Sequence, residues 1–162
     1  MPQEFLEKYT PLCWKIARAF ADSPDDQQDL IQELFITLWQ AMPRMDASGK
    51  ESTFVYRVAL NRAITWQRRR TTYARYLAAF RREPRVADAP DESRQLLEQL
   101  YAAIRRLPDI DRSLVLMHLE HLSYREIAEI LDISESNVGA RLSRLRKKLA
   151  DDLSTERNHA NQ

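Results

Sequence analysis

Apolar residues recur at intervals of three and four along most of the chain, which is the spacing of one face of an α-helix. In residues 5–20 they predict an amphipathic helix that breaks or restarts at Pro11, because proline suits a first helical turn better than a helix interior. The apolar positions of this segment are Phe5, Tyr9, Leu12, Ile16 and Phe20.

The next segment carries its own start and stop signals. Ser23 is predicted to cap a helix that begins with a proline and has Asp26 three residues after the cap, and Pro43 ends it. Its inner stripe consists of Leu30, Ile31, Leu34, Phe35, Leu38, Trp39 and Met42. At about 100° per residue, Asp26, Asp29 and Glu33 fall together opposite this stripe. The sequence therefore predicts an outward-facing acidic sector.

A loop and an unusual helix follow. Residues 44–52 contain a glycine and mixed polar residues, and either Ser52 or Thr53 is predicted to cap the next helix. That helix mixes aromatic and aliphatic residues with arginines, so it has no clean polar face. Residues 83–93 hold two prolines and several acids, which predicts a linker and a domain boundary.

Two more helices are expected beyond the linker, the first ended by Pro108 and the second capped by Asp109 or Asp111. Their apolar stripes are Leu96, Leu97, Leu100, Tyr101, Ile104 and Leu107, and then Leu114, Val115, Leu119 and Leu122.

Residues 122–149 contain two helical segments separated by a two-residue corner. Ser123 and Glu126 form a capping-box pattern, Ser134 is placed to cap the second segment, and the small Ala128 lies where the two helices approach. This combination is typical of a helix-turn-helix unit.

The second helix of this unit has distinct inner and outer faces. The inner positions are Val138, Leu142, Leu145 and Leu149, and the outer ones are Ser136, Asn137, Ala140, Arg141, Ser143, Arg144, Lys147 and Lys148. Small and amide side chains near the N-terminus suit the major groove, and the later cations suit phosphates. The alternative is an ordinary amphipathic helix whose cations complement its dipole. The combined pattern favours DNA binding.

Composition narrows the class of protein. The 162 residues include two glycines and many strong helix formers, so we expect an all-α chain. Neither an apolar run of about 20 residues nor a signal-peptide pattern is present, which predicts a cytoplasmic protein without membrane insertion. Cys13, the one cysteine, is expected to fill the core. The net charge of +1 hides segregation, because residues 52–82 hold eight arginines and no acid.

With these features, the chain resembles the bacterial sigma-70 family, specifically the extracytoplasmic function (ECF) sigma factors. The stretch LPDIDRSLVLMHLEHLSYREIAEILDISESNVGARLSRLRKKL is similar to region 4, which binds the minus-35 promoter element in that family. DDQQDLIQELFITLWQAM resembles region 2.2, and ESTFVYRVALNRAITWQRRR resembles regions 2.3 to 2.4. The order of these stretches also matches, so the resemblance covers nearly the whole chain.

The resemblance implies two small helical domains joined by a flexible acidic linker. These are a region 2-like bundle at 1–75, a linker at 76–93, a region 4-like helix-turn-helix domain at 94–155 and a disordered tail at 156–162. The implied partners are core RNA polymerase, promoter DNA and an anti-sigma factor, and no small-molecule substrate is implied.

Carried over residue by residue, the resemblance implies three sets of contacts. The residues implied to bind core polymerase are Asp26, Asp29, Gln32 and Glu33. Those implied to bind the minus-10 element are Lys50, Ser52, Thr53, Tyr56, Arg57, Asn61, Arg62 and Arg68. Those implied to bind the minus-35 element are Tyr124, Arg125, Ser136, Asn137, Ala140, Arg141, Arg144, Lys147 and Lys148.

Three positions depart from the family pattern. Phe54 stands where many relatives have tryptophan, and Asp132 replaces the usual glycine at the corner, where a left-handed backbone is often required. Gly139 lies inside the recognition helix, where glycine costs about 1 kcal/mol relative to alanine.

Other classes of function fit the sequence less well. His118 and His121 share a helix face, but one distant cysteine and no nearby acid pair make a poor metal site, so we expect no metal, no cofactor and no catalytic residue. The main alternative is a stand-alone helix-turn-helix transcriptional regulator that dimerises on a palindrome. A second is an RNA-binding or scaffold protein that uses residues 52–82.

Overall fold

The computed structural model describes residues 2–46, 50–77 and 91–160. Every regular element in this part of the chain is helical, which confirms the all-α prediction. Most of the predicted linker, residues 78–90, lies outside the described residues.

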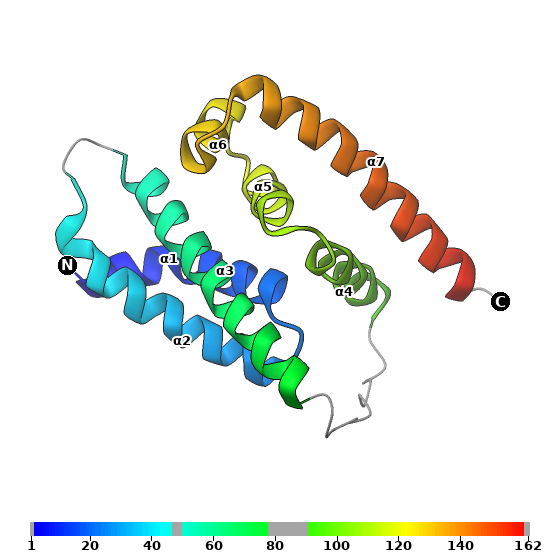
Figure 1. Cartoon of the computed structure of the whole chain (residues 1–162), viewed down its shortest axis with the longest axis horizontal. Coiled ribbons are helices and arrows are strands. Elements are labelled where there is room, and N and C mark those ends of the chain that lie inside the picture. Colours follow the sequence, from blue (N-terminus) through cyan, green and yellow to red (C-terminus); the bar gives the residue numbers. More distant parts are fainter. Residues whose placement is uncertain (1, 47–49, 78–90, 161–162) are drawn as a thin grey trace.

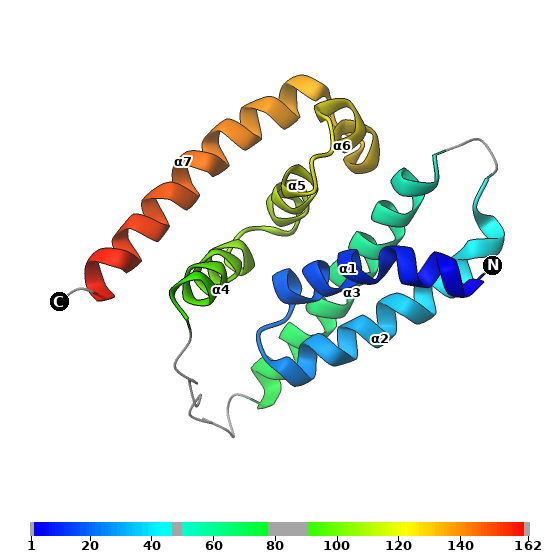
Figure 2. The same ribbon diagram turned by 180° about the vertical axis from the view of Figure 1, so that it is seen from behind.

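The described helices form two bundles (Figure 1). The N-terminal bundle contains α1 (Pro2–Phe20), α2 (Pro24–Ala41), a short 3₁₀ turn (Met42–Arg44) and α3 (Glu51–Leu77). The C-terminal bundle contains α4 (Glu92–Arg105), α5 (Asp109–Leu119), α6 (Tyr124–Leu131) and α7 (Glu135–Ala160). Seen from both sides, α4 and α5 lie between α7 and the N-terminal bundle (Figure 2).

Several helix boundaries follow directly from local sequence. The Ser23 hydroxyl accepts from the backbone N–H of Asp26 at 3.1 Å, and α2 ends just before Pro43, as predicted. At the other end of the chain, the Ser134 hydroxyl accepts from the N–H of Asn137 at 3.1 Å and caps α7. These caps satisfy backbone donors that a helix leaves without partners at its N-terminus.

Other boundaries differ from the predictions. The helix α1 runs through Pro11 without a break, because the buried Tyr9 and Leu12 on either side hold it against the core. Burying each of these two side chains stabilises the fold by about 1.5–3 kcal/mol. This offsets the backbone hydrogen bond that Pro11, which has no N–H, cannot donate. The helix α3 begins at Glu51, so neither Ser52 nor Thr53 caps it. The expected tail at 156–162 is helical as far as Ala160.

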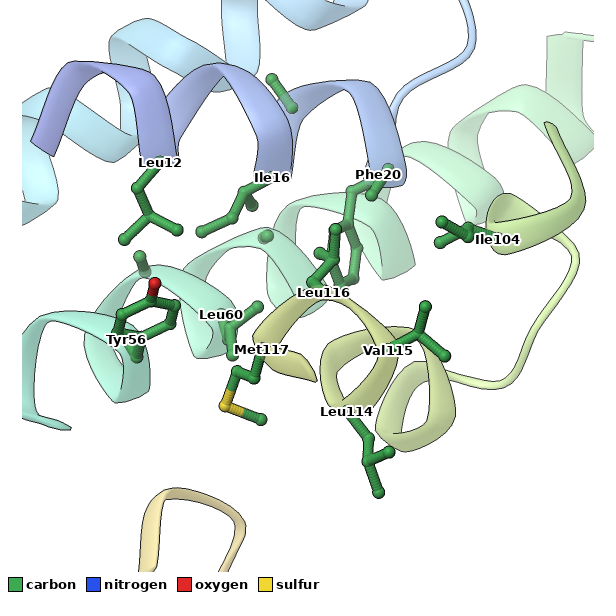
Figure 3. Close-up of a cluster of buried hydrophobic side chains, with 14 of the residues drawn as sticks. Leu12, Ile16, Phe20, Tyr56, Leu60, Ile104, Leu114, Val115, Leu116 and Met117 are labelled. Carbon is green, nitrogen blue, oxygen red and sulfur yellow. The ribbon is translucent and has the colours of Figure 1, made fainter. Parts of the chain in front are cut away.

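The two bundles share one apolar core rather than standing apart. Figure 3 shows Leu12, Ile16 and Phe20 of α1 facing Leu116 and Met117 of α5. Tyr56 and Leu60 of α3 complete the contact between the bundles. Cys13 is fully buried in this core, as predicted.

A buried arginine also joins the bundles. The Arg112 side chain of α5 is 5% exposed and stacks over the Phe20 ring at 4.7 Å. It donates to the carbonyl oxygens of Arg105 and Leu107 at 2.7 and 2.8 Å and to the Gln67 side chain of α3. Burial lowers the pKa of Arg112, yet an arginine remains charged at any physiological pH. Its charge therefore caps α4 and ties α5 to α3.

Candidate nucleic-acid interface

The α6–α7 pair has helix-turn-helix geometry. The backbone N–H of Ser123 donates to the Glu126 carboxylate at 2.7 Å and the N–H of Glu126 donates to the Ser123 hydroxyl at 3.2 Å, which confirms the capping box. Asp132 adopts the left-handed conformation, with φ 56° and ψ 48°, that the corner requires. Ala128 and Val138 are buried where the helices meet.

The predicted recognition face of α7 is turned outward. Its exposed members are Ser136, Ala140, Arg144, Lys147 and Lys148, and Tyr124 and Arg125 are exposed at the start of α6. Asn137 and Arg141 are half-buried. The surface therefore presents small side chains first and cations later, the order that suits a helix in the major groove.

Arg141 has a partner that sequence reasoning missed. Its Nη1 donates to Asp111 Oδ1 at 2.8 Å, and its Nε donates to Asn137 Oδ1 at 3.1 Å. Either Asp109 or Asp111 was expected to cap α5, but neither does so, and the N-cap position is Pro108. Asp111 instead holds the Arg141 side chain against α5.

Gly139 faces the ring of Tyr124. A Cβ added at Gly139 would lie 3.5 Å from Tyr124 Cε2, an ordinary van der Waals distance. The packing therefore does not require glycine at this position.

The predicted minus-10 residues lie along α3 and at its start, and four of them are engaged within the chain. Lys50 pairs with Glu129 of α6, and Arg57 Nη2 donates to the Glu129 carbonyl oxygen at 2.7 Å. Arg68 donates to Asp109 Oδ2 from Nε and Nη2 at 3.2 and 3.1 Å, and Arg62 pairs with Glu33 of α2. Ser52 and Asn61 are exposed and Thr53 is half-buried.

Tyr56 does not fit the prediction of a DNA contact in this conformation. It is 8% exposed and packs in the core between the bundles (Figure 3). Burial, with the nearby carboxylates of Glu120 and Glu126, raises the pKa of Tyr56 to about 12. The resemblance to the family identifies the position of Tyr56 but does not say whether its ring is buried.

A groove between α2 and α3 adds residues that the sequence did not point to. It has a volume of about 360 Å³ and is lined by Thr37, Gln40, Ala41, Arg44, Phe54, Val58, Asn61, Arg62 and Thr65. Hydroxyl, amide and guanidinium groups thus surround a hollow beside Asn61. Arg62 Nε is buried there without a hydrogen-bond partner among the described residues. A smaller hollow of about 170 Å³ next to it is lined by Arg44, Lys50, Thr53, Arg57 and Glu129, among others.

The acidic sector of α2 is only partly available to a partner, because two of its carboxylates form ion pairs within the chain. Asp29 and Gln32 are exposed, whereas Asp26 pairs with Arg70 and Glu33 pairs with Arg62. Beside them Ile36 is 56% exposed and Trp39 is 52% exposed, although Trp39 was expected in the inner stripe. Ile36 lies seven residues after Asp29, on the same side of the helix. The outer surface of α2 is therefore both acidic and apolar.

Among the described residues, no helix is long and apolar enough to cross a membrane, and no group of three or more His, Cys, Asp or Glu is placed to hold a metal ion. His118 is instead within 2.9 Å of the Arg146 guanidinium, and burial together with that cation lowers its pKa.

Comparison with known proteins gives two family matches in order along the chain. The Sigma-70 region 2 model matches residues 5–73, and the Sigma-70, region 4 model matches residues 97–149. The ECF RNA polymerase sigma-E factor of Haemophilus influenzae is 31% identical over 140 residues, which cover 78% of this chain and 74% of that protein. The ECF RNA polymerase sigma factor SigW of Bacillus subtilis is 27% identical over 168 residues, covering 91% and 86%.

Two solved structures share the fold. The sigma factor RpoE of Bartonella quintana, in complex with the anti-sigma factor NepR, has a TM-score of 0.74 at 20% identity, covering 94% of this chain and 96% of that one. CnrH, in complex with the cytosolic domain of CnrY, has a TM-score of 0.69 at 21% identity, covering 95% and 88%. With both sigma-70 regions matched in order and with this level of identity to a sigma-E factor, the chain belongs to the sigma-70 family, among the ECF RNA polymerase sigma factors.

Proposed function

We propose that this chain directs core RNA polymerase to promoters through three separate surfaces, one for polymerase and one for each promoter element. It acts in the cytoplasm, has no catalytic activity of its own and needs no cofactor. The observation that carries the proposal is the outward-facing basic surface of α7, set opposite the buried Val138 and Leu142.

The surface for the minus-35 element is the start of α6 and the outer face of α7. Ser136, Asn137 and Ala140 would reach base edges, because their short side chains let the helix approach the groove floor. Arg144, Lys147 and Lys148 would contact phosphates, so binding through them weakens as salt rises.

The surface for the minus-10 element is α3 with the groove beside it. Extruding a base costs a few kcal/mol, which stacking and cationic contacts to the captured strand offset. Asn61 lines the groove together with Arg44 and Arg62. With donor and acceptor groups on one amide, it would read a base that enters this groove.

The surface for polymerase is the outer face of α2. Asp29 and Gln32 suit a basic partner surface, and the exposed Trp39 and Ile36 supply apolar area. Tryptophan at the centre of an interface often carries much of the binding energy.

Run-off transcription with purified core polymerase on a library of genomic fragments tests this function. Wild-type protein should produce promoter-specific transcripts that disappear with Asp29→Arg and persist with Asp151→Arg, a matched reversal at an exposed acid of α7. Arg144→Ala should weaken promoter binding, whereas Arg157→Ala, an exposed arginine near the end of the same helix, should not. If the wild-type protein gave core polymerase no new start sites, the proposal would be refuted.

The main alternative, a stand-alone helix-turn-helix regulator, leaves the α2 surface and the α3 groove without a role. A gel-shift assay separates the two functions. Tight binding to a symmetric duplex site without polymerase would favour the regulator.

We also propose that an anti-sigma factor regulates this chain. The fold neighbours RpoE and CnrH were each solved with such a partner or with a partner's cytosolic domain. Affinity capture from cells should recover polymerase and a second protein that blocks transcription when it is added back. Recovery of polymerase alone under every growth condition would contradict this.

A further inference from the structure

The recognition helix α7 carries an arginine whose side chain is held from another helix. Arg141 donates from Nη1 to Asp111 Oδ1 of α5 at 2.8 Å and from Nε to Asn137 Oδ1 at 3.1 Å. Arg144 and Lys147 on the same face are instead exposed. The guanidinium of Arg141 therefore cannot turn between bases and phosphates as freely as an exposed cation can.

Both ends of this link are fixed by packed neighbours. Asp111 lies in the first turn of α5, next to Arg112, whose guanidinium donates to main-chain carbonyls where α4 ends. Arg141 precedes Leu142, which is 1% exposed. The Arg141 side chain is 29% exposed and that of Asp111 is 19% exposed, so the pair lies at the edge of the outer surface of α7. Side chains held in this way by packed helices keep a defined geometry.

The link also fixes which hydrogen-bonding groups α7 presents. Because Asn137 Oδ1 accepts from Arg141 Nε, the Asn137 Nδ2 is turned the other way and offers its two donors. A bidentate contact with adenine needs the amide oxygen and nitrogen to meet the base edge together, which this orientation prevents. Arg141 and Asn137 thus present donors, and guanine has two acceptors, O6 and N7, on its major-groove edge.

We infer that Asp111 is a positioning residue for promoter reading, which holds Arg141 and Asn137 as a pair that selects guanine over adenine at one base pair of the minus-35 element. The inference rests on the proposed role of α7. Without the carboxylate, Arg141 is free to turn toward a phosphate, since a guanidinium matches phosphate as well as guanine. Asn137 is then free to turn its amide toward adenine.

The test uses holoenzyme assembled from core polymerase and the full chain. One promoter found by run-off transcription is synthesised as a pool with a randomised minus-35 element, and the DNA that the holoenzyme binds is sequenced. The wild type should enrich guanine about tenfold over adenine at one base pair, a discrimination typical of one well-formed contact. Asn137→Ala should abolish this preference and thereby identify the base pair.

Asp111→Asn removes the charge of the carboxylate and keeps the size of the side chain. It should reduce the enrichment of guanine over adenine to about threefold or less at that base pair and leave the other base pairs unchanged. In the Arg141→Ala background it should have no further effect, because the carboxylate acts through that guanidinium. An acid with only a structural role would instead weaken binding to every sequence alike.

Glu156→Gln is the matched control. It breaks the pair between Glu156 of α7 and Arg106, which lies in the same bundle, and should leave every base frequency as in the wild type. Circular dichroism checks the helices of each variant, and Asp111→Ser replaces Asp111→Asn if the latter unfolds. Unfolding of both would mean that the carboxylate holds the fold rather than the reading pair, which overturns the inference.

The remaining outcomes separate this inference from the proposed function. If Asn137→Ala changes no base frequency and Arg144→Ala does not weaken binding, the proposed role of α7 is overturned and the inference with it. If both have their effects, a guanine preference that survives Asp111→Asn overturns the inference alone. A wild-type preference for another base at that position, or an effect of Asp111→Asn without Arg141, does the same.

Discussion

Replacing Arg112 with alanine should destabilise the whole chain, because this side chain satisfies buried groups in both bundles. Its guanidinium donates to the carbonyl oxygens of Arg105, the last residue of α4, and of Leu107 just beyond it, and to the Gln67 side chain of α3. It also covers the Phe20 ring of α1. With the side chain only 5% exposed, water cannot easily take over these contacts.

The magnitude follows from the two main-chain bonds at 2.7 and 2.8 Å. A hydrogen bond to a charged group contributes about 1.5–3 kcal/mol. Removing Arg112 also removes the cost of burying its charge, which reduces the total loss from the two bonds. We therefore expect Arg112→Ala to lower the free energy of unfolding by about 3 kcal/mol. Arg112→Lys keeps the charge but lacks the planar fork, so about 1–2 kcal/mol is expected.

Urea denaturation followed by circular dichroism at 222 nm measures both values. Arg144→Ala, an exposed arginine of α7, is the matched control and should change stability by less than about 0.5 kcal/mol. A loss below about 1 kcal/mol for Arg112→Ala would refute the reasoning, since the carbonyls would then be solvated at little cost.

Three further changes test local features. Gly139→Ala should stabilise the chain by about 1 kcal/mol, measured by thermal unfolding, because the added Cβ meets Tyr124 at an ordinary 3.5 Å; a lower melting temperature would contradict this. Hydrogen bonds from Ser123 hold the pKa of Glu126 below its usual value, so this stabilisation is present at neutral pH and is lost as pH falls through the lowered pKa. Glu126→Gln should therefore flatten the acid limb of a stability-versus-pH curve, and an unchanged limb would count against the capping box. Burial raises the pKa of Cys13 to about 12, so iodoacetamide at pH 8 should label it only after denaturation, and rapid labelling of the native chain would show that α1 opens.

Structural features that depend only on residues close together in the sequence were predictable. The caps at Ser23 and Ser123, the stop before Pro43 and the left-handed Asp132 each follow from one short motif. Such motifs act within a single turn of chain, where backbone donors and acceptors must find partners whatever the rest of the molecule does. The helix-turn-helix unit and its exposed basic face were predicted for the same reason.

Predictions failed where a distant surface outweighed a local preference. Pro11 lies inside an unbroken α1, because the core on both sides of it is buried. Trp39 is exposed although its spacing fits the inner stripe. Helical periodicity places a residue on a face, but it does not say how wide the buried part of that face is.

The amino-acid sequence by itself determined the helical class, the caps at Ser23, Ser123 and Ser134, the helix-turn-helix corner and the segregation of charge, because each is a property of residues within a few positions of one another. Only the tertiary structure decided which charges meet. Glu129 lies 79 residues from Lys50, and Asp109 lies 41 residues from Arg68. These pairings arise because the apolar faces of α1 and α5 bury each other, which carries the acids of one bundle onto the cations of the other.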